Sequence, residues 1–218
     1  MADISVHALG RKAGKYAANK TFNPNQAELL GYGAEIILGS ILKLAVLFSI
    51  ATLLRVVYEV SILLFIIGLL RTLSGGAHCS AYYRCLVASV IIIISLGCMI
   101  KVMFPLFQGL PGLILLTGVL MVSIYLYCHY APQAPLSKPL KSKAIEDKFR
   151  RLTILTALFL SIVSIIAGPG YLISWIIAFG LLWQAFTLTP FGHLLIKKLD
   201  ILFSLNWKGG ELNVKTHQ

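Results

Sequence analysis

Charged residues are scarce in this chain of 218 residues. Asp, Glu, Lys and Arg make up 12% of it, whereas 58% of the residues are hydrophobic and the mean hydropathy is +0.85. Soluble domains have a charged fraction of about 25%, so the composition excludes an ordinary soluble domain. The sequence therefore predicts an integral membrane protein.

Acidic residues are particularly few. Eight Asp and Glu stand against nineteen Lys and Arg, which gives a formal charge of +11. Such an excess could indicate a nucleic-acid partner, but the basic residues lie in the gaps between long apolar runs. That pattern is typical of loops that face anionic lipid on the cytoplasmic side of a membrane. We expect a lipid bilayer as partner and no nucleic acid.

Several short motifs are also missing. The chain has no Walker A sequence, no GxGxxG and no paired CxxC, which excludes the usual nucleotide and zinc sites, and we expect no cofactor and no metal. The first residues, MADISVHALGRKAGKY, lack a compact apolar core followed by a cleavage site, so we expect no removable signal peptide. Four cysteines lie in or beside apolar runs, which favours free thiols over a secreted disulfide framework: Cys79, Cys85, Cys98 and Cys128.

Long apolar runs dominate the rest of the chain and predict an all-α protein with about six transmembrane helices, since about 20 residues cross a bilayer. The runs cover residues 36–54, 56–70, 86–104, 111–130, 152–167 and 171–189. The second and fifth are short for full spans. Gly168-Pro169-Gly170 predicts a tight turn between the last two, and Asn25 with Glu28 predicts a helix start by the capping-box pattern.

Mixed apolar and basic stretches at both ends predict amphipathic helices on the membrane surface. We divide the chain into an N-terminal interfacial helix and lead-in segment at 1–34, a six-span membrane domain at 35–190, and a C-terminal interfacial helix and tail at 191–218.

Basic residues near the segment ends predict the orientation. With six spans, sixteen of the nineteen fall on one side, which places both termini in the cytoplasm. Only Arg55 and Lys101 fall on the other side, and Lys43 lies within the first span.

The stretch RTLSGGAHCSAYYRC, from Arg71 to Cys85, concentrates chemistry in this otherwise apolar chain. A free thiol at Cys85 could act as a nucleophile, and the imidazole of His78 could accept and return its proton. On one unbroken helix the two residues would lie about 10.5 Å apart along the axis, too far for a hydrogen bond. Ser74-Gly75-Gly76 can bend the chain, so we expect His78 on a loop or re-entrant turn and a new helix that bears Cys85.

Other candidates stay open. Cys79 is a rival nucleophile, although its side chain and that of adjacent His78 would point apart in regular structure. Glu28 or Glu35 could orient His78, and Lys43 is a candidate because a lysine inside a span is costly. Each could equally have a purely structural role, as a helix-start carboxylate or a snorkelling lysine.

Arg71, Ser74-Gly75-Gly76, His78 and Cys85, set in a basic six-span protein of this length, resemble the AgrB family of membrane cysteine endopeptidases. The resemblance implies a homodimer in the cell membrane, with its active site on the cytoplasmic side, that processes an AgrD-type propeptide in quorum sensing. It implies that Cys85 attacks the propeptide near its C-terminal segment and that His78 is the general base and acid. A peptidyl thioester would form and cyclise to a thiolactone or lactone, with Arg71, Ser74, Gly75, Gly76 and Lys43 shaping the site.

Two other functions are compatible with the composition. A small membrane exporter could use Lys43 and the glycine-rich segments to line a pathway. A non-catalytic membrane partner could be anchored by S-acylation of a juxtamembrane cysteine such as Cys79.

Overall fold

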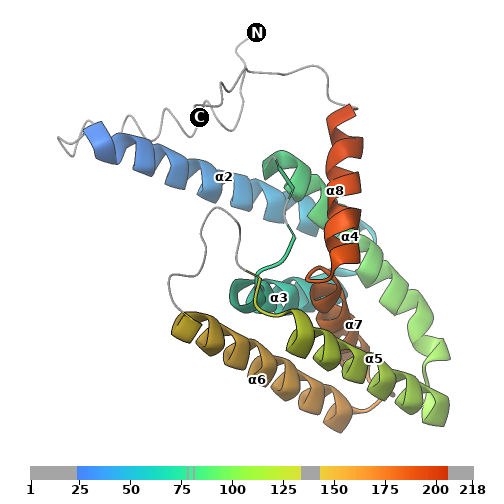
Figure 1. Cartoon of the computed structure of the whole chain (residues 1–218). Helices are drawn as coiled ribbons and strands as arrows, with labels where there is room; N and C mark the ends of the chain where they lie inside the picture. Colours follow the sequence, from blue (N-terminus) through green and yellow to red (C-terminus); the bar gives the residue numbers. More distant parts are fainter. Residues whose placement is uncertain (1–23, 78, 81, 134–142, 206–218) are drawn as a thin grey trace. The chain divides into compact units, whose positions relative to one another are not determined.

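The computed structural model describes residues 24–77, 79–80, 82–133 and 143–205, and the described residues are helical apart from short connections (Figure 1). They form seven α-helices and one 3₁₀ turn: α2 (Pro24–Leu53), α3 (Val57–Ser74), α4 (Tyr82–Met103), η1 (Phe104–Leu106), α5 (Gly109–Tyr130), α6 (Lys143–Ala167), α7 (Leu172–Phe186) and α8 (Pro190–Leu205). No strand occurs in the described part of the chain. The all-α membrane fold predicted from composition is confirmed.

The chain divides into two units, Met1–Leu53 and Leu54–Gln218. The described part of the first unit is α2, which begins at Pro24, one residue before the predicted capping position Asn25. Its apolar part, Ile37–Leu53, covers the first predicted span. The predicted helix before residue 20 lies outside the described residues, and the division at 34 and 190 stays a prediction.

Helix α7 forms the centre of the second unit, packed against α3, α4, α5 and α6 (Figure 1). It is apolar on all sides, as expected of a helix buried in a bundle, and Trp175, Ile176 and Leu181 are fully buried. Glycine permits the close approach of α3, because a Cβ on Gly180 would lie 3.1 Å from the side chain of Ile66. Trp175 is therefore a packing residue of the core.

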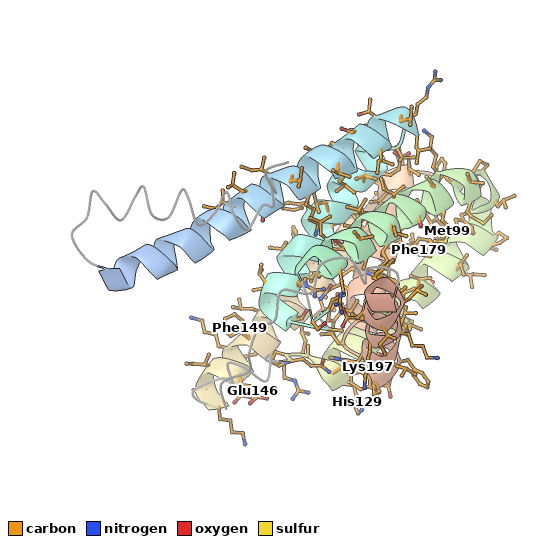
Figure 2. The ribbon with its side chains drawn as sticks, turned by 90° about the horizontal axis from the view of Figure 1, so that it is seen from above. Met99, His129, Glu146, Phe149, Phe179 and Lys197 are labelled. Carbon is orange, nitrogen blue, oxygen red and sulfur yellow. The ribbon has the colours of Figure 1, made fainter. Side chains whose placement is uncertain are left out.

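Large apolar side chains project from the outer sides of the helices, as the view from above shows (Figure 2). Phe159 and Ile166 on α6 and Met121 on α5 are more than half exposed. Exposed apolar surface of this extent is incompatible with water and suits a hydrocarbon environment. The helices therefore present lipid-facing surfaces around a buried α7.

Four helices, α3, α4, α5 and α6, are long and apolar enough to cross a membrane. The two predicted segments that looked short are longer as helices, because α3 continues to Ser74 and α6 begins at Lys143, giving 18 and 25 residues. The last predicted segment differs from a straight span: α7 has 15 residues and meets α8 at 84°. At 1.5 Å per residue α7 is about 22 Å long, so it crosses alone only a thinned bilayer.

The predicted turn at Gly168-Pro169-Gly170 is present between α6 and α7. Gly168 has a φ of 81°, and its carbonyl oxygen accepts a hydrogen bond of 2.6 Å from Ser174 Oγ. The Trp175 indole donates to the Pro169 carbonyl at 3.0 Å. These bonds fix the end of the bundle opposite the turn that follows α3.

Candidate active site

Helix α3 ends at Ser74 because the next residue adopts a conformation that favours glycine. Gly75 has a φ of 74° and donates its N–H to the Arg71 carbonyl at 3.0 Å. A Cβ at Gly75 would lie 2.0 Å from the carbonyl oxygen of Gln133, a distance that real side chains do not reach. Gly76 follows with a φ of 128°. The predicted glycine bend is thus present, and only glycine fits at Gly75.

The bend is joined to the segment that follows α5. Gln133 donates its N–H to the Ser74 carbonyl at 2.8 Å and forms an isolated parallel bridge with Gly75. Its side chain donates to the Leu188 carbonyl at 2.5 Å and also contacts His193 Nε2 at 2.5 Å. One residue therefore connects the ends of α3, α5 and α7.

The buried side-chain amide of Gln184 on α7 donates hydrogen bonds to the bend. Gln184, near the C-terminal end of α7, is fully buried and donates to the Gly75 carbonyl at 2.9 Å and to Ser74 Oγ at 3.2 Å. Its Oε1 atom has no partner among the described residues. The Ser74 hydroxyl donates in turn to the Leu70 carbonyl at 2.8 Å. The backbone carbonyl freed by the end of α3 is thereby satisfied inside the bundle.

Arg71 and Thr187 hold the residue just before position 78. The Arg71 guanidinium donates to the Ala77 carbonyl at 2.5 Å, and the Ala77 N–H donates to the Thr187 carbonyl at 3.3 Å. Arg71 also lies close enough to Cys79 and Cys85 to interact electrostatically with both sulfurs. Arg71 therefore places a positive charge beside both sulfurs.

Cys85 lies in the first turn of α4, half-buried, so the predicted new helix that bears it is present and begins at Tyr82. The half-buried Cys79 shares a side-chain hydrogen bond with Cys85. Burial raises the pKa of Cys79 from 9.0 to about 11, aided by the charges of Cys85 and Asp200 and opposed by Arg71. Cys79 is therefore protonated at neutral pH.

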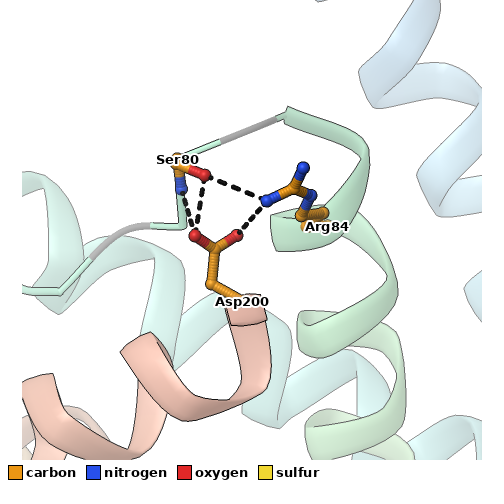
Figure 3. A network of polar contacts seen from close by, with 3 residues as sticks. All are labelled: Ser80, Arg84 and Asp200. Carbon is orange, nitrogen blue, oxygen red and sulfur yellow. Dashed lines mark hydrogen bonds and ion pairs between the residues drawn. The ribbon is translucent and has the colours of Figure 1, made fainter. Parts of the chain in front are cut away.

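A polar network joins α8 to the loop between α3 and α4 (Figure 3). Asp200 Oδ2 accepts hydrogen bonds from the Ser80 hydroxyl at 2.7 Å and from the Ser80 N–H at 3.3 Å. Arg84 Nη1 lies 3.5 Å from Asp200 Oδ1 and 3.3 Å from Ser80 Oγ. The network spans one residue after Cys79 to one residue before Cys85.

Comparison with known proteins assigns the chain to a family. The profile of the accessory gene regulator B (AgrB) family matches residues 11–188. The chain belongs to the AgrB family. It is 28% identical over 198 residues to a putative AgrB-like protein of Clostridium perfringens strain SM101, covering 85% of this chain and 92% of that one. It is 27% identical over 158 residues to accessory gene regulator protein B of Staphylococcus intermedius, covering 72% and 79% of the two chains. No solved structure matches the chain.

Some residues predicted for this AgrB-family site lie close together in the structure, whereas others lie outside the described residues. Arg71, Ser74, Gly75 and Gly76 surround one bend, and Cys85 lies a short loop away. His78 lies outside the described residues, as do the side chains of Glu28 and Glu35. Lys43 is on α2 in the first unit. The roles assigned to Cys85, His78 and Lys43 stay predictions.

Four polar residues around the bend were missed from sequence: Gln133, Gln184, Thr187 and Asp200. Two of them carry a usable signal. Gln184 is a polar amide in the apolar run that forms α7, and Asp200 is the one acidic residue of α8. Isolated polar residues in such settings usually have a specific partner. Gln133 has no comparable signal because its backbone makes the contacts with the bend.

Proposed function

We propose that this protein is a membrane cysteine endopeptidase that removes the C-terminal segment of an AgrD-type propeptide and promotes cyclisation of the remainder. Membership of the AgrB family supports a role in accessory gene regulator quorum sensing. The observation that carries the finer proposal is the glycine bend. It ends α3 at Ser74, and a new helix begins at Tyr82, so the chain leaves the helix at Gly75 and Cys85 lies in the first turn of the next helix.

The chemistry proceeds in two transfers. His78 takes the proton of Cys85, and the thiolate attacks the carbonyl carbon of the scissile peptide bond. The C–N bond then breaks, the proton passes from His78 to the leaving amine, and a thioester joins the peptide to Cys85. An internal thiol or hydroxyl of the peptide then gives its proton to His78 and attacks the thioester carbonyl. The bond to Cys85 breaks, the ring closes, and the proton returns from His78 to the Cys85 thiolate. Proximity allows this intramolecular attack to outcompete water.

The raised pKa of Cys79 counts against Cys79 as the nucleophile. Cys79 remains a thiol at neutral pH because its pKa is raised to about 11, and a thiol is a poor nucleophile. The same property counts against S-acylation of Cys79, the modification on which a non-catalytic anchored partner would depend. Arg71 lies close enough to Cys85 to interact with it electrostatically, and so places a positive charge beside the proposed nucleophile.

Basic residues near the bend suit an acidic propeptide tail. Gln133 is bridged to Gly75, and the basic segment Lys138–Arg151 comes a few residues later in the sequence; the described part of this segment, from Lys143, forms the start of α6. Arg150 donates to the Cys128 carbonyl at 2.7 Å, which keeps the start of α6 beside the end of α5. We propose that this basic segment holds the departing tail of the substrate.

We further propose that this end of the bundle faces the cytoplasm. Bonds between Gly75, Gln133 and Leu188 join the C-terminal ends of α3, α5 and α7 there, and α4 and α6 begin there. At the opposite end Lys101 donates to the Arg55 carbonyl. The arrangement fits the rule that loops on the cytoplasmic side of a membrane carry most of the Lys and Arg residues.

A homodimer is proposed from the family resemblance. Two copies that carry different affinity tags, co-expressed and extracted in mild detergent, are expected to purify together. Recovery of only singly tagged protein would contradict the homodimer.

Cleavage assays with cysteine variants test the enzyme directly. With purified protein in vesicles and an AgrD-type peptide, Cys85→Ala should abolish cleavage and should lose the covalent peptide adduct seen by mass spectrometry on the unmodified protein. Cys79→Ala is the matched control and should still cleave. Full cleavage by Cys85→Ala would refute the proposal, and peptide flux without cleavage would favour an exporter.

A further inference from the structure

The Ser80–Arg84–Asp200 network connects α8 to the segment between the two residues proposed for catalysis. Asp200 is 116 residues from Arg84 and 120 from Ser80 in sequence, so the contact is tertiary and long-range. Both carboxylate oxygens are used, one by Ser80 and one by Arg84. The Arg84 and Asp200 side chains are 22% and 15% exposed, which makes the pair more shielded than a surface ion pair.

The loop has few other fixed points among the described residues. Ala77 is held by Arg71 and by the Thr187 carbonyl before position 78, and Ser80 is held by Asp200 after it. The carboxylate accepts from both the backbone N–H and the hydroxyl of Ser80, so it restrains the backbone of the loop as well as a side chain. A restraint at this point limits where the residues on either side can lie.

We propose that Asp200 is a positioning residue: by its contacts with Ser80 and Arg84 it holds these two residues against α8, and so sets the placement of Cys85, which directly follows Arg84. The inference rests on the proposed function for its catalytic meaning. The proposal makes α8 part of the candidate active site, whereas the amphipathic pattern of this helix predicts only a helix that anchors the protein at the membrane surface.

Catalysis by a thiolate and imidazole depends on near-attack geometry, and an error of about 1 Å can cost about 100-fold in rate. Loss of Asp200 would leave Ser80 and Arg84 without this partner and would let the loop move. The contacts that the structure describes for Asp200 are with Ser80 and Arg84 and not with Cys85, so its loss should lower kcat and leave KM little changed.

The first test measures propeptide cleavage by Asp200→Ala, Asp200→Asn and Asp200→Glu in vesicles. We expect kcat to fall at least tenfold in Asp200→Ala, with KM within twofold, and to recover partly in Asp200→Glu. Lys198→Ala is the matched control, because Lys198 is exposed and lies about 200° around α8 from Asp200, and it should cleave normally. An unchanged kcat in Asp200→Ala would overturn the proposal.

A double-mutant cycle asks whether Asp200 acts through Ser80. If it does, Ser80→Ala with Asp200→Asn should be no slower than the slower single variant. If the rate losses of the two single variants instead multiply in the double variant, Asp200 does not act through Ser80, and the proposal is overturned. This comparison uses mild substitutions, so it remains decisive if Asp200→Ala fails to fold.

A second measurement is independent of catalysis. In a background with Cys79 as the single cysteine, Asp200→Asn and Ser80→Ala should both raise the rate of Cys79 alkylation by iodoacetamide several-fold at pH 8. Asp200→Asn also removes a nearby negative charge, whereas Ser80→Ala keeps it, so the rise in Ser80→Ala measures release of the loop alone. An unchanged rate in Ser80→Ala would overturn the positioning role even if cleavage falls. If Cys85→Ala still cleaves, the proposed function fails, whereas the alkylation result still decides whether Asp200 holds the loop.

Discussion

A single backbone conformation at Gly75 makes the candidate site possible. Its φ of 74° ends α3, and its missing side chain admits the Gln133 carbonyl. Both requirements point to glycine for separate reasons, one conformational and one steric. Substitution at this position therefore tests the bend more directly than substitution at Gly76, where a Cβ would meet Thr187 Oγ1 at 3.0 Å.

We predict that Gly75→Ala destabilises the protein by about 2 kcal/mol or more. The φ of 74° and ψ of −142° at Gly75 form a conformation almost restricted to glycine, which costs other residues about 1–3 kcal/mol, and the clash adds to it. Propeptide cleavage should be lost. Thermal unfolding in detergent and the cleavage assay measure the two effects. Gly118→Ala on α5 is the control, because nothing lies within 4 Å of its added Cβ, and it should remain stable and active. Normal stability of Gly75→Ala would contradict the described bend.

The raised pKa of Cys79 gives a pH prediction. A thiol reacts as its thiolate, so a shift from 9.0 to about 11 lowers the thiolate fraction at pH 8 by about 100-fold. In a background without Cys98 and Cys128, which keeps Cys85, alkylation of Cys79 followed by peptide mass spectrometry should rise steadily up to pH 10 and reach its midpoint near 11. A plateau by pH 9 would show that burial, Cys85 and Asp200 do not raise this pKa.

At the scale of elements, the C-terminal end of α7 supports the bend. Gln184 donates twice to residues about 110 positions earlier, from inside an apolar helix. Because its Oε1 atom is buried without a described partner, the residue is costly to bury as well as stabilising. Its presence in the core therefore suggests that Gln184 serves mainly to fix the geometry of the bend and contributes little to the stability of the fold.

We predict that Gln184→Leu changes stability by only about 1 kcal/mol, because the lost hydrogen bonds are offset by removal of the unpaired oxygen. Cleavage should slow by about tenfold, which corresponds to about 1.4 kcal/mol in the barrier. Thermal unfolding and the cleavage rate separate the two effects. Equal cleavage by the variant and the parent would show that the bend does not depend on α7.

The local features of the site could be predicted from the sequence, whereas its long-range contacts could not. The bend was predictable because two consecutive glycines between apolar runs weaken a helix and permit a positive φ, and the restart at α4 followed from it. Gln133, Gln184 and Asp200 were missed because their partners lie 55 to 120 residues away, which periodicity cannot show. A break between the last span and a C-terminal helix was predicted near residue 190, but the 84° angle between α7 and α8 was not, since a hydropathy window reports composition and not direction.

At the scale of the whole molecule, the connections decide which ends of the helices lie together. The bend after α3, the segment after α5 and the link after α7 are joined by hydrogen bonds, and the basic start of α6 lies next to the end of α5. Gln108, in the link between η1 and α5, lies at the other end, near the turn at Gly168 to Gly170. The two ends differ in charge, so the bilayer should fix one orientation.

We predict that the basic end faces the cytoplasm. In intact cells, a membrane-impermeant maleimide should label Gln108→Cys in a background without other cysteines, whereas Lys198→Cys should react only after the membrane is permeabilised. Both positions are exposed, so access and not burial decides the result. The reverse pattern would place the bend and Cys85 outside the cell, where a propeptide made in the cytoplasm would have to cross the membrane before cleavage. Labelling of both positions from outside would instead show that Gln108 and Lys198 lie on the same side, so that the chain between them crosses the bilayer an even number of times.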